Sequence, residues 1–297
     1  MHFQHDFLLR VYPFVLAGVA AEIAWYRVVR REPYPWKETF TSLGCFLLRV
    51  PARLLTSVVV GVLAFYVWSL RPFTVPLDTA WGLALLFLGE ELAYYWSHRS
   101  GHMVRWMWAT HVVHHTPATI HFASAYRLGA TELLSGGWLF YLPLYFLGFN
   151  PLAVAGMLGV NLFYQFWLHT TMFGRLGPLE WVFNTPAHHR VHHASNSDCL
   201  DRNFGGILIV FDRMFGTFAE AKPGIALTYG LVEPIGSMNP LKIMVHEWIT
   251  MARDVRLAGT WRARLTQLFG KPEASLTHAT VAPARVAAEA SSRGNAR

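Results

Sequence analysis

The chain is poor in charged residues and in cysteine. Only 14% of its 297 residues are charged, whereas an average soluble domain carries about 25%, and the mean hydropathy is +0.28. This composition argues against a disordered chain and against an ordinary soluble enzyme, and it indicates a membrane protein. The two cysteines, Cys45 and Cys199, are too few for a disulfide framework, so any metal ligands must be histidine or carboxylate.

Several sequence signatures are missing as well. The chain contains no DNA- or RNA-binding motif, no H-E-x-x-H pattern of zinc proteases, and no flavin, haem or iron–sulfur motif. We expect no cleavable signal peptide, because the first residues, MHFQHD, lack a basic region. The net charge of +7 in a membrane protein reports topology and attraction to anionic lipid, so we expect a membrane as partner and no nucleic acid.

Long apolar stretches are present, and each approaches the roughly 20 residues needed to cross a bilayer. The candidates are residues 7–26, 54–70, 79–96, 133–149 and 152–168. Asn150-Pro151, between the last two, predicts a tight turn, because proline cannot donate within a helix and asparagine favours turns. We therefore predict an all-α integral membrane helical bundle with about four or five spans, some of which could be re-entrant or buried.

Lysine and arginine set the expected orientation of these spans. The segment 27–53 holds several arginines and Lys37, whereas the segment 71–78 holds one arginine. We therefore expect 27–53 to be a cytoplasmic loop and 71–78 to lie outside, an arrangement that also brings the histidines described next to the cytoplasmic face. Residues 241–269 predict an amphipathic helix or helix pair at the membrane surface.

Histidine is the residue in excess, with 15 in the chain and eleven of them between His98 and His193. They form an HxxxH box, an HxxHH box, a single histidine at the end of an apolar stretch, and a second HxxHH box with one further histidine before it. In order these are His98 and His102; His111, His114 and His115; His169; and His188 ahead of His189, His192 and His193. Helix positions three and four apart share a face, so we expect each box to point its imidazoles in one direction.

The number of these histidines predicts two metal ions. The boxes supply two, three and three ligands, His169 makes nine, and one ion takes roughly four to six. A chain with this histidine content would contain HxxHH by chance about 0.04 times, so two copies are a strong signal. An all-histidine, cysteine-free, binuclear site favours redox iron over structural zinc, and the ligand type alone leaves zinc open.

The motifs around the boxes carry a family resemblance. They read YWSHR at 95–99, HVVHH at 111–115, NTP at 184–186 ahead of HHRVHH at 188–193, DRNFGG at 201–206 and DRMFGTF at 212–218. Over roughly residues 79–270 the chain resembles the fatty acid hydroxylase/sterol desaturase superfamily of integral-membrane di-iron enzymes. QFWLHT at 165–170 and the segment 229–241 favour its alkylglycerol monooxygenase and bacterial sterol desaturase-like branch.

This resemblance implies a di-iron oxygenase that uses O2 and two external electrons to hydroxylate or desaturate a C–H bond of a lipid. The substrate class would be a sterol, a fatty acyl chain or an ether lipid, entering from the bilayer. The implied catalytic metal ligands are His98, His102, His111, His114, His115, His169, His189, His192 and His193, with His188 as a further metal ligand. A cytochrome b5-like, ferredoxin-like or pterin electron donor would serve the basic cytoplasmic face.

The domain division follows from the same resemblance. We expect membrane spans over 1–78, the di-iron catalytic domain with a cytoplasmic His-lined cap over 79–270, and a disordered tail over 271–297, where apolar periodicity is lost. The protein would reside in a bacterial inner membrane with its catalytic face cytoplasmic.

Some neighbouring residues depart from the family or have open roles. The chain has Glu90 and Glu91 where relatives often have Asp, Ala194 where Gly is common, and His121 where Asn is common. Metal-bound histidines usually donate their other N–H to an oxygen, and Asp201, Glu132 and Glu180 are candidates for that role, while Gln165 lies one turn before His169.

Two other classes of protein remain open. A metal transporter predicts ligands near the middle of the membrane, whereas these boxes follow the apolar stretches. A zinc hydrolase needs an open metal position and a nearby general base, and the sequence lacks the H-E-x-x-H pattern that would supply them.

Overall fold

The computed structural model describes residues 2–272, with side chains from Pro13 onward. Within this part the chain is helical and has no β-strand, so the all-α prediction is confirmed there. The described residues contain two isolated antiparallel β-bridges, Phe183–Leu208 and Ala194–Tyr229. Nearly all of the tail predicted to be disordered, 271–297, lies outside the described residues.

The α-helices differ widely in length. Their bounds are α1 His2–Trp25, α2 Trp36–Ser69, α3 Ala80–Met103, α4 Arg105–His115, α5 Glu132–Ser135, α6 Leu142–Phe146, α7 Pro151–Leu168, α8 Pro186–His192, α9 Val210–Met214, α10 Pro240–Leu257 and α11 Trp261–Phe269. A π-helical turn, η1 (Tyr26–Arg30), follows α1, and short 3-10 helices fill the connections: η2 Phe122–Tyr126, η3 Gly137–Tyr141, η4 Gly177–Trp181 and η5 Ser197–Cys199.

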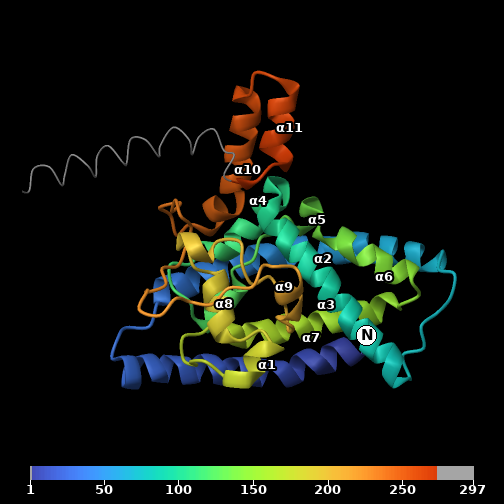
Figure 1. The fold of residues 1–297 in the computed structure, drawn as a ribbon, viewed down its shortest axis with the longest axis horizontal. Helices are drawn as coiled ribbons and strands as arrows, with labels where there is room; N and C mark the ends of the chain where they lie inside the picture. Colours follow the sequence, from blue (N-terminus) through green and yellow to red (C-terminus); the bar gives the residue numbers. More distant parts are fainter. Residues whose placement is uncertain (1, 273–297) are drawn as a thin grey trace, which may run out of the picture.

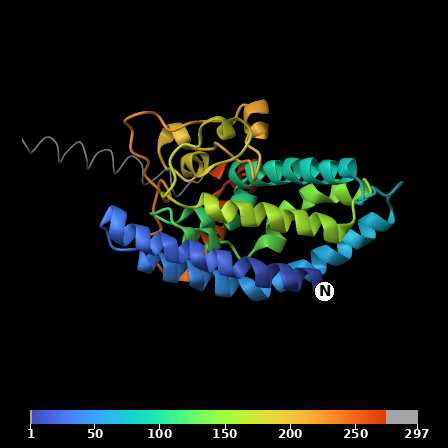
Figure 2. The same cartoon turned by 90° about the horizontal axis from the view of Figure 1, so that it is seen from below.

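The long helices α1, α2 and α7 run along the long axis of the molecule, whereas α3 is inclined to it (Figures 1 and 2). Their connections at one end, 70–79 and 147–150, meet each other, since the backbone N–H of Val75 donates to the carbonyl of Gly148 at 3.1 Å. Loops and short helices of residues 170–240 cover the other end (Figure 2). The pair α10–α11, predicted as an amphipathic helix or helix pair, projects sideways from the bundle (Figure 1).

Two of the described helices are long and apolar enough to cross a membrane: Trp36–Ser69 and Pro151–Leu168. Only 11% of the apolar window of α2 is buried inside the protein. Its outward side chains include Leu54, Val58 and Val62, which are 66%, 66% and 69% exposed. A contiguous exposed apolar face of this kind marks a membrane or protein contact. The predicted count of four or five spans stays a prediction.

Two sequence predictions about local structure are wrong. The stretch 133–149 is not one helix but the series α5, η3 and α6, because Gly136 adopts φ +80° and a residue in that conformation ends a helix. The expected loop 27–53 is mostly helical, since α2 begins at Trp36. The predicted turn at Asn150-Pro151 is confirmed, with the Asn150 side chain accepting a hydrogen bond from the N–H of Leu152 at the start of α7.

Helix α3 carries two carboxylates into the bundle interior, where both are fully buried. The Asn161 side-chain amide on α7 donates to Glu90 at 3.2 Å and to Glu91 at 2.7 Å. Glu91 also accepts from the backbone N–H groups of Ile207 and Leu208 at 3.0 and 2.7 Å. These contacts join α3, α7 and the 203–208 loop, because buried carboxylates must be hydrogen-bonded.

Helix α4, which carries the first HxxHH box, is anchored by Arg105. The guanidinium is fully buried and donates to Glu247 and Asp254 on α10 and to Gln267 on α11, at 2.8, 2.7 and 2.7 Å. A planar guanidinium can serve three acceptors at once. The sideways helix pair therefore fixes the position of α4.

Candidate metal centre

Nine histidines converge in two groups in the interior. The five-histidine group contains His98, His102, His111, His115 and His192, and the four-histidine group contains His114, His169, His189 and His193. Within each group the nitrogen atoms that could bind a metal lie within 4.8 Å of one another. All nine were predicted as ligands, and eight are buried, while His111 is half-buried.

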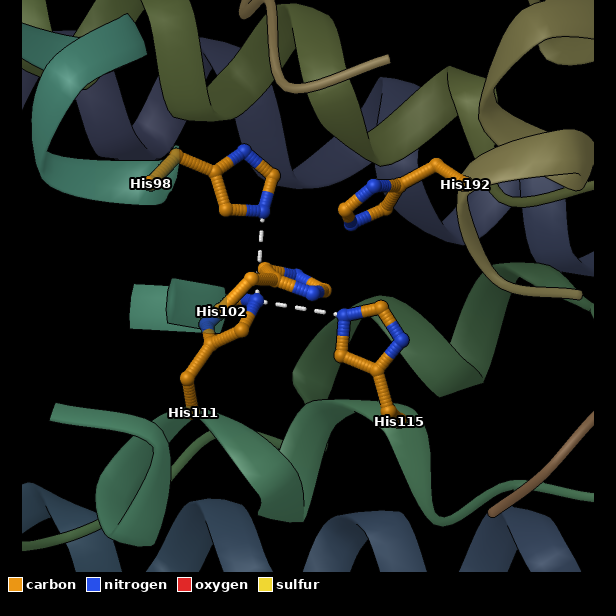
Figure 3. A group of neighbouring side chains, drawn as sticks. All are labelled: His98, His102, His111, His115 and His192. Atoms are coloured by element: carbon orange, nitrogen blue, oxygen red, sulfur yellow. Dashed lines mark hydrogen bonds between the residues drawn. The ribbon is translucent and has the colours of Figure 1, made fainter. Parts of the chain in front are cut away.

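The five-histidine group draws on three helices, as Figure 3 shows. His98 and His102 lie one turn apart on α3, His111 and His115 one turn apart on α4, and His192 comes from α8. The Nε2 atom of His111 lies 3.1 Å from the Nε2 atoms of both His98 and His115. The spacing of four residues thus places two imidazoles side by side on each helix.

The four-histidine group draws on α4 and α8 again and on the end of α7. His169 caps the C-terminus of α7, His114 lies near the end of α4, and His189 and His193 come from α8 and its C-cap. The Nε2 atom of His169 is 3.2 Å from that of His114 and 3.0 Å from that of His189. The Nε2 atoms of His189 and His193 are 3.1 Å apart.

Each HxxHH box is divided between the two groups. On α4, His111 and His115 belong to the five-histidine group and His114 to the four-histidine group. On α8 the order is reversed, with His189 and His193 in the four-histidine group and His192 in the five-histidine group. The expectation that all three imidazoles of a box point in one direction is wrong, because positions four apart differ by about 40° around a helix whereas the intervening position lies about 60° to the other side.

The opposite ring nitrogen of several of these histidines faces a backbone carbonyl. His98 Nδ1 lies 2.8 Å from the Phe204 carbonyl, His192 Nδ1 2.9 Å from that of Arg202, and His169 Nδ1 2.8 Å from that of Gln165. Donation from Nδ1 to an acceptor leaves Nε2 unprotonated and directed at the centre, which is the form that binds a metal.

Loop 201–206 presents the carbonyls of Phe204 and Arg202 and is itself held by the carboxylate of Asp212. Asp212 accepts from the N–H groups of Phe204 and Gly205 at 2.8 and 2.7 Å. A Cβ on Gly206 would overlap the side-chain amide of Asn161, so only glycine allows the loop to approach α7 this closely. The DRNFGG motif is therefore explained by the backbone that it places against His98 and His192.

The arrangement of these histidines is better explained by bound metal ions than by imidazoles that pack without a metal. The Nε2 atoms of His102 and His192 are buried without a hydrogen-bond partner among the described residues. A buried polar atom is costly unless it is paired. Distances of 3.0 to 3.2 Å between neighbouring Nε2 atoms are also the separations expected around one ion with metal–nitrogen bonds of about 2.1 Å.

Burial keeps these imidazoles neutral. It lowers the pKa of His169 to about 4, while the hydrogen bond to the Gln165 carbonyl opposes the shift. For His114 and His115 burial again has the largest effect, and neighbouring imidazoles add to it, so that the pKa of each lies well below 6.5. Neutral imidazole is the state that coordinates a metal.

The other predicted residues lie in different places. Asp201 is positioned as expected, with its Oδ1 3.6 Å from His102 Nδ1. Glu132 instead pairs with Arg49 and Arg53 on α2. His188 and Glu180 belong to neither histidine group and lie together in a third cluster.

His121 also lies apart from both groups. It is fully buried, and its Nε2 lies 3.2 Å from Thr39 Oγ1. The functional groups that sequence reasoning missed are the carbonyls of Phe204, Arg202 and Arg127, the last 3.2 Å from His114 Nδ1. No residue type could have indicated them, because every residue carries a carbonyl.

A large apolar pocket of about 1330 Å3 lies along α3. It runs between α3, which contributes Leu88 and Leu92, and the α5–α6 segment, which contributes Trp138 and Pro143. Its lining includes Met107, which lies one turn before His111 on α4. The pocket therefore leads from the apolar flank of the bundle to the helix that carries the half-buried histidine.

Comparison with known proteins finds a family that matches part of the chain. The fatty acid hydroxylase family matches residues 83–217, a range that contains all nine convergent histidines, from His98 to His193. Over this range the chain is similar to the fatty acid hydroxylase family. No solved structure matches the chain.

Relatives of this chain include proteins named alkylglycerol monooxygenase. The human protein of that name is 36% identical over 245 residues, 81% of this chain and 54% of its own length. The Xenopus tropicalis protein is 35% identical over 88% of this chain and 58% of its own length. The ornithine lipid hydroxylase OlsE of Rhizobium tropici is 33% identical over 43% of this chain and 39% of its own length. The chain thus spans little more than half the length of these alkylglycerol monooxygenases.

Proposed function

We propose that this chain is a membrane-bound di-iron oxygenase that hydroxylates a C–H bond of a lipid with O2 and two external electrons. The observation that carries the proposal is the pair of adjacent all-histidine groups, which share helices α4 and α8. The reaction converts C–H, O2, two electrons and two protons into C–OH and water. It fits the names of the relatives, which are lipid monooxygenases and hydroxylases.

The donor set favours iron in both groups. Each iron would be held by imidazole alone, with five histidines in one group and four in the other. Structural zinc sites, by contrast, usually include cysteine. The zinc-hydrolase alternative needs a general base in the site, and no carboxylate belongs to either histidine group. The transporter alternative needs ligands near the middle of the spans, whereas His169 is the C-cap of α7 and His98 and His102 lie in the last two turns of α3.

Two irons held by these groups would supply the reaction of O2 with an unactivated C–H bond. The protein's own residues would do the rest. Carbonyls of Phe204, Arg202 and Gln165 orient the imidazoles, and burial keeps water from the centre. The chain's own motifs hold no redox group besides these metals, so an external electron donor such as a cytochrome b5-like protein, a ferredoxin-like protein or a pterin would supply the electrons.

The substrate that we propose is a lipid with a long alkyl chain, of the ether-lipid class that the relatives' names indicate. The apolar pocket along α3 has the chemistry and position to hold such a chain. We place the protein in a bacterial inner membrane with the histidine groups on the cytoplasmic side, supported by the basic residues of 27–53 and the exposed apolar face of α2.

The test combines metal content with lipid analysis. Protein expressed with ample iron should contain about two irons per chain, and lipid extracts from cells with the active gene should contain a species that has gained one oxygen. His114→Ala should abolish that product while the protein still inserts into the membrane. His246→Gln, on α10 outside both groups, is the matched control. Stoichiometric zinc, or turnover that survives in His114→Ala, would overturn the assignment.

A further inference from the structure

A third cluster of potential ligands lies outside both histidine groups. The ligand atoms of Glu180, His188 and Glu220 lie within 4.8 Å of one another. They come from η4, the first half of α8 and the loop after the DRMFGTF motif. We infer that these three residues form a separate binding site for a divalent cation of the zinc class, independent of the di-iron proposal.

His188 is the observation that points to a ligand. Its side chain is 2% exposed, and neither ring nitrogen has a hydrogen-bond partner among residues 13–272. One edge of the ring packs against Phe218, with ring centroids 5.2 Å apart. A buried imidazole without any partner is costly, and a cation bound to one nitrogen would remove that cost.

The two carboxylates are arranged to complete the site. Glu180 is 2% exposed, and its Oε1 accepts from the N–H of Leu176 at 2.9 Å and lies 3.4 Å from Thr185 Oγ1. Its Oε2 is left for a cationic partner. Glu220 is half exposed in its side chain, so it provides an entry from solvent.

Arg175 supplies that cationic partner in this structure. Its guanidinium donates to Glu180 Oε2 at 3.1 Å and to Glu220 Oε1 at 2.6 Å. The Arg175 side chain is 63% exposed, so it can move into solvent when a cation binds. Arg213 also lies nearby, but its guanidinium stacks on the Phe218 ring at 3.7 Å. Arg175 and a divalent cation would therefore compete for the same two carboxylates.

The donor chemistry suits zinc. One imidazole nitrogen and two carboxylate oxygens are accepted zinc ligands, and three protein ligands with one open position is a common arrangement. The site would connect three separate segments of the cap at the helix that also carries His189, His192 and His193. A cation that binds only the folded chain would stabilise this helix in place.

The test is a zinc titration of the full-length protein, purified in detergent and loaded with iron, by equilibrium dialysis with metal analysis. The wild-type protein should bind one zinc per chain with its iron content unchanged. Glu220→Gln should weaken zinc binding by roughly tenfold or more, since a ligand is lost. Arg175→Gln should bind zinc at least as tightly as wild type, because the competing guanidinium is gone.

Asp198→Asn is the matched control, because Asp198 is an exposed carboxylate paired with one basic side chain, Lys222, and lies outside the cluster. It should bind zinc as the wild type does. His188→Gln gives a second test of the ligand set and should also weaken binding. The inference would be overturned if Glu220→Gln did not weaken zinc binding or if zinc displaced iron mole for mole. It would also be overturned if Arg175→Gln or Asp198→Asn weakened zinc binding as much as Glu220→Gln does. Zinc binding of the expected kind in protein without iron would leave it standing even if the di-iron proposal failed.

Discussion

The Nε2 atoms of His169 and His114 lie 3.2 Å apart although 55 residues separate the two in the chain. One residue is the C-cap of α7, and the other lies near the C-terminus of α4. Their approach forms the four-histidine group, which has one ligand fewer than its neighbour. The two groups should therefore respond differently to the loss of one imidazole.

Loss of one histidine should reduce the iron content more in the four-histidine group than in the five-histidine group. His169→Ala leaves three histidines there, and we expect iron to fall from about two to about one per chain. His102→Ala leaves four histidines in the five-histidine group, so that group should retain its iron with lower affinity. Metal analysis of protein purified in parallel measures both. Equal iron loss in the two variants would contradict the asymmetry.

Asp201 should tune the metal affinity through His102. Its carboxylate lies 3.6 Å from His102 Nδ1, and removal of such a partner typically lowers metal affinity by about 10- to 100-fold. Asp201→Asn keeps the side-chain size and tolerates the backbone φ of +55° at this position, so the loop should keep its shape. We expect roughly tenfold weaker iron retention against a competing chelator. Asp198→Asn is the control, and equal retention in both variants would assign Asp201 no such role.

The clustering of the histidines could be predicted from the sequence because helix geometry makes local spacing meaningful. His98 and His102, or His189 and His193, lie one turn apart whatever surrounds them. The division of each box between two groups was not accessible, since His114 and His192 take their places only when α4, α7 and α8 pack together.

Other features depend on contacts between distant segments. Gly136 breaks the stretch 133–149 through its backbone conformation, which apolar composition does not reveal. Glu132 and Asp201 are both carboxylates near histidines in sequence, yet Glu132 binds Arg49 on α2 and only Asp201 faces a ligand. A pairing choice of this kind is decided by tertiary packing.

Acid should destabilise the metal-free protein. Burial lowers the pKa of His169 to about 4 and holds that of His114 and His189 well below 6.5, whereas unfolded histidine titrates near about 6.5. Between these values the unfolded chain binds more protons than the folded chain, so stability is lost as pH falls below about 6.5.

The measurement is the thermal unfolding midpoint of chelator-treated protein in detergent at pH 7.5, 6 and 5. We expect the midpoint to decrease steadily over this range. A His169→Gln variant should show a shallower decrease, because one of the shifted groups is absent, and His246→Gln should match the wild type. A midpoint that stays constant from pH 7.5 to 5 would show that the imidazoles are not buried in neutral form.

Filling the apolar pocket should lower the turnover of long-chain substrates and leave the iron content unchanged. Leu92 lines the pocket from α3 and is 38% exposed, so Leu92→Trp can occupy the space without disrupting the interior. We expect kcat/KM for a long-chain lipid to fall by about tenfold or more, with the loss decreasing as the alkyl chain is shortened. Iron content should not change. Leu83→Trp is the matched control, since Leu83 is an exposed leucine of the same helix outside the pocket lining. If both variants lose activity equally, or if Leu92→Trp loses none, the alkyl chain does not bind along this face of α3.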